Sequence, residues 1–194
     1  MGPELVELER ALLAELDSRR FLRLLVESVS RLFRAVCGVW LVHDGDTLVE
    51  HITTAPRSFP ADPMPFGEGV AGSCATARRG LLVNEYPASS LALSRYVRLH
   101  IRHSMAHPLL MGDELLGVLS MSRYGDDKAP FTAEEFASVE RLAGFAALAL
   151  RNARLYDEAV RRRGQAGVMA ELGPENAPNA CNDCHRDPSP AWAA

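Results

Sequence analysis

The sequence lacks several features that would place the protein in a special class. No apolar run approaches the about 20 residues that a helix needs to cross a bilayer, so no membrane span is predicted. Four cysteines in 194 residues are too few for a disulfide framework. The first seven residues are acidic and carry no basic stretch, which argues against a secretory signal and predicts a cytoplasmic location. A net charge of −4 gives no general reason to bind nucleic acid.

What remains is ordinary globular usage. The chain is 47% hydrophobic and 24% charged, which is enough for a substantial core. A length of 194 residues predicts one domain with appendages.

The hydrophobic period changes along the chain and predicts a mixed α+β order. The predicted helices are an N-terminal helix over 1–34 (with a break near Asp17), short helices at 69–79 and 94–100, and a long C-terminal helix over 132–163. The predicted strands are 35–42, 47–53, 81–83, 103–110 and 114–121, with an Asp-Gly turn at 43–46. Thr132 and Glu135 form a capping box before the last helix. A flexible tail is predicted over 164–194.

Five segments, in this order and at these intervals, resemble a GAF domain over residues 20–155. They are 66–72 (FGEGVAG), 82–85 (LVNE), 103–109 (HSMAHPL), 114–120 (ELLGVLS) and 131–135 (FTAEE). The resemblance implies an α+β fold with a central antiparallel sheet, helices on one face and long N- and C-terminal helices. It further implies a signal-transduction sensor, a ligand pocket walled by residues 84–107, and a homodimer that pairs the N- and C-terminal helices.

The glycines of the first segment also match a dinucleotide fingerprint, Gly67-x-Gly69-x-x-Gly72, with Glu85 as an acid further on. Such a loop must follow a buried strand, whereas prolines precede this one. We therefore expect no nucleotide cofactor, and we expect the glycines to open a helix against the sheet. The polar Asn-Lys-x-x-Asp-Glu set of cyclic-nucleotide-binding GAF domains is absent too.

No nucleophile and base stand at catalytic spacing, so no enzyme and no catalytic residue are predicted. Cys37 and Cys74 lie in apolar surroundings and are expected to pack as small core residues.

The C-terminal segment contains Cys181-Asn182-Asp183-Cys184-His185, a CxxCH spacing that is typical of c-type haem attachment. With its flanks, PNACNDCHRDPSPAWA, it resembles haem-binding segments of multihaem c-type cytochromes. The resemblance implies haem c bound through Cys181 and Cys184, with His185 as the proximal iron ligand. A zinc site, a redox dithiol and an inert tail remain alternatives. Haem attachment of this kind takes place outside the bacterial cytoplasm, so a haem-bearing chain would be periplasmic and a fragment.

A distal ligand to the iron could come from elsewhere in the chain, because imidazole and thioether are common axial ligands. His103, Met105 and His107 alternate along one predicted strand and share one face of the sheet. The candidates are His100, His103, Met105, His107 and Met169. The alternative is that these histidines are bonded to their neighbours. The prediction is thus a redox or diatomic-gas sensor, with a cytosolic GAF module for a small organic ligand as the alternative.

Overall fold

The structure is a computed structural model that describes residues 6–7, 18–125 and 128–171. Its helices are α2 (Ser18–Phe33), α3 (Gly69–Ala77), the 3₁₀ helix η1 (Tyr86–Ala88), α4 (Ser94–Val97) and α5 (Ala133–Glu171). Its strands are β1 (Val36–His43), β2 (Thr47–Thr53), β3 (Met64–Pro65), β4 (Leu81–Val83), β5 (Ile101–Met111) and β6 (Glu114–Tyr124). The chain divides into two compact units, residues 1–154 and 155–194, and the fold below is that of the first unit.

The six strands form one sheet in the order β3-β2-β1-β6-β5-β4, and every pair is antiparallel. The predicted α+β fold with a central antiparallel sheet is confirmed. The Asp-Gly turn joins β1 to β2, with positive φ angles of 49° at Asp44 and 87° at Gly45. Hairpin turns with positive φ angles match the twist of the flanking strands, and glycine adopts a positive φ angle without strain.

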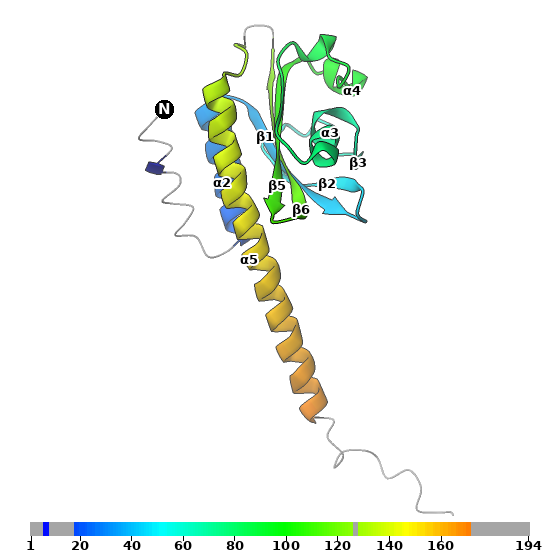
Figure 1. Cartoon of the computed structure of the whole chain (residues 1–194), viewed down its shortest axis with the longest axis vertical. Helices are drawn as coiled ribbons and strands as arrows, with labels where there is room; N and C mark the ends of the chain where they lie inside the picture. Colours follow the sequence, from blue (N-terminus) through cyan, green and yellow to red (C-terminus); the bar gives the residue numbers. More distant parts are fainter. Residues whose placement is uncertain (1–5, 8–17, 126–127, 172–194) are drawn as a thin grey trace, which may run out of the picture. The chain divides into compact units, whose positions relative to one another are not determined.

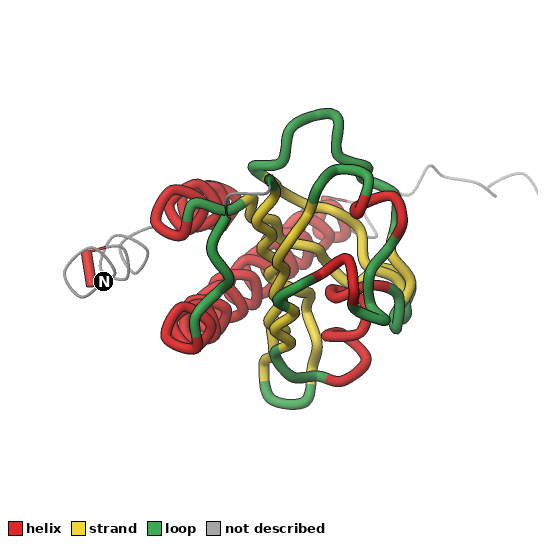
Figure 2. Tube along the Cα trace, turned by 90° about the horizontal axis from the view of Figure 1, so that it is seen from above, coloured by secondary structure: helices red, strands yellow, loops and turns green. Residues whose placement is uncertain are grey.

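Helices cover both faces of the sheet (Figures 1 and 2). α2 and the part of α5 that belongs to the first unit lie on one face, called here the helix side. The short helices α3 and α4 and their loops lie on the other face, called here the cap side. The prediction of helices on one face therefore holds for the two terminal helices, whereas the short helices pack opposite them. They do so because strand residues alternate between two apolar faces.

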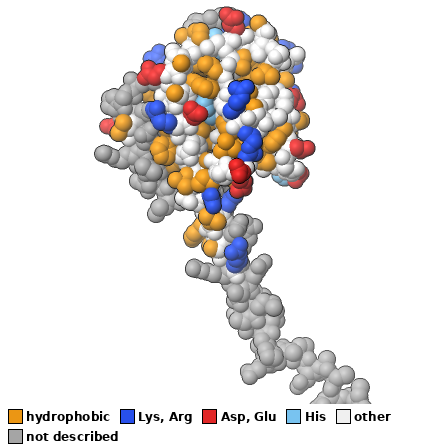
Figure 3. All heavy atoms as spheres, viewed as in Figure 1, with side chains coloured by type: hydrophobic (Ala, Val, Ile, Leu, Met, Phe, Trp, Pro, Cys, Tyr) orange, Lys and Arg blue, Asp and Glu red, His pale blue; other side chains and the backbone are white. Residues whose placement is uncertain are grey.

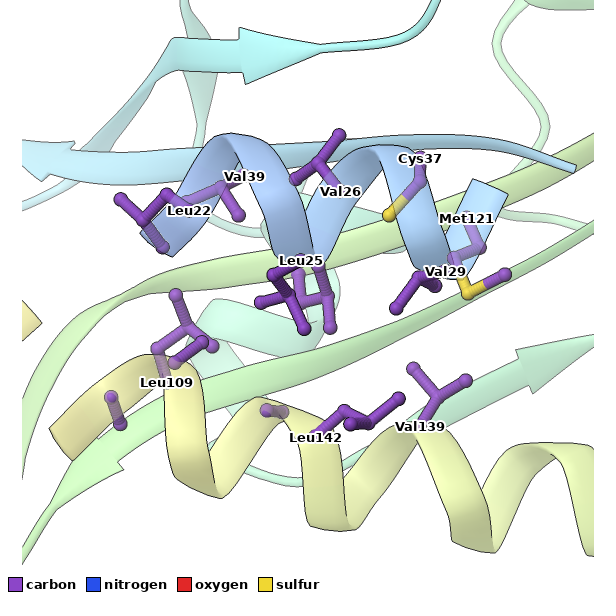
Figure 4. Close-up of a cluster of buried hydrophobic side chains, with 14 of the residues drawn as sticks. Leu22, Leu25, Val26, Val29, Cys37, Val39, Leu109, Met121, Val139 and Leu142 are labelled. Carbon is purple, nitrogen blue, oxygen red and sulfur yellow. The ribbon is translucent and has the colours of Figure 1, made fainter. Parts of the chain in front are cut away.

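The helix side contains the larger core (Figure 4). Leucine and valine side chains of α2 and α5 belong to one cluster with Cys37, Val39 and Met121 of the sheet, and Leu25 of α2 and Leu142 of α5 point toward one another. Leu25, Val29 and Leu142 are almost fully buried. A buried aliphatic side chain of this size contributes about 1.5–3 kcal/mol, so this layer holds α2 and α5 against the sheet.

Several predicted boundaries differ from the structure. α5 ends at Glu171, past the predicted end at 163, and it includes Gly164 and Gly167. The two-residue strand β3 lies in the segment before Gly67 that contains several prolines, where no strand was predicted. Residues 8–17, including the predicted break near Asp17, lie outside the described residues.

The beginning of α5 is as predicted. The backbone N–H of Glu135 donates to Thr132 Oγ1 at 3.1 Å, and the backbone N–H of Thr132 donates to Glu135 Oε2 at 2.8 Å. This reciprocal pair is a capping box, and it satisfies two N–H groups that the first turn leaves without helical partners.

Acidic and basic side chains are interspersed on the face of the molecule shown in Figure 3. Within the described residues, no helix is both long and apolar enough to span a membrane.

Candidate functional site: a cavity on the cap side of the sheet

A cavity of about 80 Å³ lies on the cap side, between the sheet and the segment that contains α3, η1 and α4. A single water needs roughly 10–15 Å³ on a comparable measure, so several could fit. Strand residues that alternate with the helix-side core form its floor. The floor residues used below are Gly38, Trp40, Glu50, Ser104, Ser120 and Ser122.

Hydroxyl groups line the floor at the centre of the sheet. Ser104 lies opposite Ser122 across β5 and β6, and their Oγ atoms are 3.1 Å apart. Trp40 Nε1–H donates to Ser120 Oγ at 2.9 Å. Gly38 lies opposite Ser120, and a Cβ at this position would come within 3.3 Å of Thr53 Oγ1. These contacts fix the floor in position.

Aromatic residues of the cap form the wall. Tyr86 is buried, and its hydroxyl accepts a hydrogen bond from the backbone N–H of Leu93 at 2.9 Å. This bond ties η1 to the residue before α4. Arg95 on α4 forms an ion pair with Glu68, the residue before α3, at 2.8 Å. The cap is thus held together by bonds between its own elements.

Among the lining residues that the structure describes, one carries a charge at neutral pH. Glu50 on β2 lies opposite Trp40 of β1 and is partly buried. Burial raises the pKa of the Glu50 carboxyl above its ordinary value. Within the described part of the chain, no ion pair compensates this carboxylate.

Sequence and fold agree on the family. The family profile for the GAF domain matches residues 15–151, which is more than half of the chain. This chain belongs to the GAF domain family. GAF domains form a family of sensory and regulatory modules.

Solved structures share the fold at low sequence identity. The GAF domain of a phosphoenolpyruvate-protein phosphotransferase from Coxiella burnetii is 20% identical, with a TM-score of 0.71 over 80% of this chain and 95% of that one. The free methionine-R-sulfoxide reductase of Neisseria meningitidis, in complex with its substrate, is 20% identical, with a TM-score of 0.68 over 78% and 89%. The GAF-B domain of DevS from Mycobacterium smegmatis is 21% identical, with a TM-score of 0.60 over 74% and 99%. No curated protein matches the sequence.

The GAF resemblance predicted that residues 84–107 wall a pocket. Tyr86, Leu93, Tyr96, Ile101 and Ser104 of this segment do line the cavity. The signal for the floor was present in the sequence as well. On β6 Ser120 and Ser122 flank the large apolar Met121, and on β5 Ser104 precedes the large apolar Met105, so the period of a strand separates these serines from the two methionines.

The predicted distal ligands lie elsewhere. His103, Met105 and His107 share one face as predicted, but that face is the helix side and not the cavity side. Met105 is fully buried in the helix-side core. His100 is exposed at the start of β5 with a positive φ of 58°.

His103 is occupied by hydrogen bonds to the backbone. Its Nδ1 accepts from the backbone N–H of Glu85 at 3.4 Å, and its Nε2 lies 3.1 Å from the carbonyl oxygen of Lys128. These partners assign the hydrogen to Nε2. His103 therefore matches the alternative stated for the sequence, a histidine that is hydrogen-bonded to its neighbours.

His107 lies under α5 without such bonds. Its ring packs on Phe136 with centroids 4.2 Å apart, and no hydrogen bond of normal geometry reaches either ring nitrogen from the described residues. Burial lowers the pKa of His107 to about 4, and the backbone of Phe136 opposes this only in part. A neutral, enclosed ring of this kind is a packing residue.

The remaining predicted site residues are not placed by the structure. Cys181, Cys184 and His185 lie outside the described residues. Met169 belongs to α5, but its side chain is outside what the structure describes. Among the residues described, no group of three or more His, Cys, Asp or Glu side chains could hold a metal ion.

Cys37 and Cys74 are buried free cysteines, as predicted. Burial raises the pKa of the Cys74 thiol to about 12 and that of Cys37 still further. Both are therefore protonated at neutral pH, and a thiol is a weak nucleophile and metal ligand compared with a thiolate.

Proposed function

We propose that this GAF domain is a non-enzymatic sensor that binds a small organic ligand in the cavity on the cap side. The observation that carries the proposal is the cavity itself, which has a hydrogen-bonded hydroxyl floor and an aromatic wall. Small-molecule sites are typically concave and apolar with a few placed polar groups.

Strand β6 connects this cavity to the helices. Ser122 lines the cavity, whereas its neighbour Arg123 points to the helix side and bonds Phe33 of α2 and Glu135 of α5. A ligand that moves β6 therefore acts on the ends of both helices at once. This arrangement supports a regulatory role.

The similar reductase from Neisseria raises the question of enzyme chemistry. A thiol-based reaction requires an accessible thiolate. Cys37 and Cys74 are buried and carry raised pKa values, so the described part of the domain offers no such group. We therefore infer a binding module rather than a reductase.

Trp40 provides a direct test, because its indole N–H is bonded to the cavity floor. A library of small metabolites is titrated into ¹⁵N-labelled protein with Trp192→Phe, so that Trp40 gives the one indole signal. A ligand of the cavity is expected to shift that signal in a saturable way, because it changes the bond to Ser120.

The matched control is Ser122→Leu, which fills the floor with an apolar side chain and should abolish the shift. If every library member leaves the Trp40 signal in place, or if shifts persist unchanged in Ser122→Leu, the cavity is not a ligand site.

A second candidate function rests on the CxxCH spacing at Cys181–His185. We propose that haem c attaches there and that redox state or a diatomic gas is sensed through it. When bound, the haem would supply an iron that changes charge or takes up a gas. In the described domain, Met105, His103 and His107 are buried or bonded, so they do not fit a distal ligand. Of the distal candidates whose side chains the structure describes, His100 is the exposed one.

The haem proposal is tested by co-expression with a cytochrome c maturation system in an exported form. We expect a Soret band and a haem stain that stays with the denatured polypeptide. Cys181→Ser with Cys184→Ser should remove the stain, whereas Cys37→Ser, in the domain core, should keep it. A colourless wild-type chain would eliminate haem and leave zinc, a dithiol or no role for the tail.

We further propose a homodimer in which α2 and α5 pair with those of a second copy. α5 exposes large apolar side chains along its length, namely Leu148, Leu155, Tyr156 and Val160. Sedimentation equilibrium measures the mass in solution, and a monomeric mass throughout the micromolar range would exclude this pairing.

A further inference from the structure

The hydroxyl hydrogens of the cavity floor point into the protein. Ser104 Oγ donates to the carbonyl oxygen of Met121 at 3.2 Å, and Ser120 Oγ donates to that of Gly38 at 3.4 Å. A serine hydroxyl has one hydrogen to give and two lone pairs that accept. Both serines have therefore used their hydrogens.

The same holds for their neighbours on the floor. Ser104 Oγ and Ser122 Oγ are 3.1 Å apart, and both contacts of Ser104 are hydrogen bonds at once when Ser122 supplies the hydrogen between the two serines. Thr53 Oγ1, at the edge of the floor, donates to the carbonyl oxygen of Cys37 at 3.3 Å. The floor thus presents oxygen lone pairs, and a ligand that bonds to it must bring its own hydrogens.

The charge of the cavity lining also favours a ligand that donates hydrogen bonds. Glu50 is the one lining side chain that is charged at neutral pH, and no lysine or arginine is among the described lining residues. Arg95 on α4 is not among the lining residues, and its Nη1 is paired with Glu68. An anionic ligand would meet the Glu50 carboxylate without a compensating cation, whereas a cation would neutralise it.

The walls suit the rest of such a ligand. Trp40, Phe59 and Tyr96 give the cavity aromatic surface, and Met64 adds a thioether. Aromatic faces attract cations and also pack against alkyl groups. Within the described lining, the hydroxyls of Tyr86 and Tyr96 are the ones that keep a hydrogen, and they lie on the cap rather than the floor.

We propose that the cavity binds a small organic ammonium compound, whose N–H groups donate to Glu50 and to the serine oxygens while its apolar part lies among the aromatic side chains. This inference rests on the proposed ligand-binding function and specifies the chemical class of the ligand.

The test compares three probes of equal chain length: butylammonium, butanoate and 1-butanol. Each is titrated into the Trp192→Phe protein, and binding is followed at the Trp40 indole signal. We expect butylammonium to bind at least about tenfold more tightly than butanoate, with 1-butanol in between. This comparison uses the unaltered cavity, so it does not depend on any cavity variant being folded.

Glu50→Gln then removes the charge and keeps the shape. This substitution is expected to weaken the binding of butylammonium at least about tenfold and to leave the affinity for 1-butanol unchanged. The matched control is Glu114→Gln, at an exposed carboxylate whose partner is Arg154 and which is not part of the lining. This variant should bind all three probes like the wild type.

The outcomes separate the two proposals. If butanoate or 1-butanol binds as tightly as butylammonium, or if Glu50→Gln changes nothing, the ammonium class is wrong and the cavity remains a ligand site. If no probe shifts the Trp40 signal, the ammonium class is also wrong. The ligand-binding function itself then falls only if the metabolite library is silent too.

Discussion

Replacing Arg123 by methionine is expected to cost about 3–5 kcal/mol of the free energy of unfolding, the largest loss from a single substitution proposed for this domain. Arg123 is 8% exposed, so its charge has little access to water. Its removal leaves Glu135 and several backbone carbonyls without their donor. Chemical denaturation followed by circular dichroism measures the change.

The cost is high because every N–H of the guanidinium is used. Nε and Nη2 donate to the carbonyl oxygen of Phe33 at 3.2 and 2.8 Å, and Nη2 also donates to Glu135 Oε1 at 2.6 Å. Nη1 donates to the carbonyl oxygens of Ala129 and Pro130, each at 3.0 Å. The group also stacks over Phe131 at 4.1 Å. One side chain on β6 thus fixes the end of α2 and the beginning of α5.

Two further variants separate the effect of the positive charge from the effect of the hydrogen-bond geometry of Arg123. Arg123→Lys keeps the charge but cannot reach all of these acceptors. Most of the free energy of unfolding that Arg123 contributes should therefore still be lost. Arg154→Met breaks an exposed pair with Glu114 (3.2 Å) and should change stability by less than about 1 kcal/mol. An Arg123→Met protein as stable as Arg154→Met would show that the buried network contributes nothing.

The fold was largely predictable because it depends on local patterns. The Asp-Gly turn, the capping box of Thr132 and Glu135, and the period of β5 and β6 each determine a local conformation, and the structure has them where the sequence placed them. The end of α5 was placed too early. Gly164 and Gly167 fall in the segment predicted as a flexible tail, but the helix continues through them, since a glycine costs only about 1 kcal/mol within a helix.

The site was harder to predict. The alternation of residue types along a strand shows which side chains share a face of the sheet, but not which face borders a cavity. His103, Met105 and His107 share one face as the alternation predicts, but that face packs under the helices and does not line the cavity. The intervening Ser104 faces the cavity instead. Which side holds the cavity depends on the contacts of α3 and α4 with the sheet, and these join residues far apart in the sequence. Arg123 was missed for the same reason, since its partner Phe33 is 90 positions away.

His107 explains a second large effect, a loss of stability in acid. Its ring is 1% exposed and lies between Phe136 and Gly80, where a Cβ on Gly80 would come within 2.7 Å of Nδ1. The enclosure leaves no room for water beside the ring on that side. Desolvation of the charged form is what lowers the pKa of His107 to about 4, from 6.5 in an unfolded chain.

The sign of the pH effect follows from this difference. Between pH 6.5 and pH 4 the unfolded chain binds a proton at His107 that the folded chain does not, so acid favours unfolding. The stabilisation is complete above pH 6.5 and is lost progressively as the pH falls towards 4. A shift of this size corresponds to about 3 kcal/mol. We expect His107→Leu to flatten the fall in unfolding free energy between pH 6.5 and 4, whereas His43→Gln, at an exposed histidine beside Asp44, should keep the wild-type slope. Denaturant titrations at a series of pH values measure these slopes, and an unchanged slope in His107→Leu would assign the acid sensitivity to other groups.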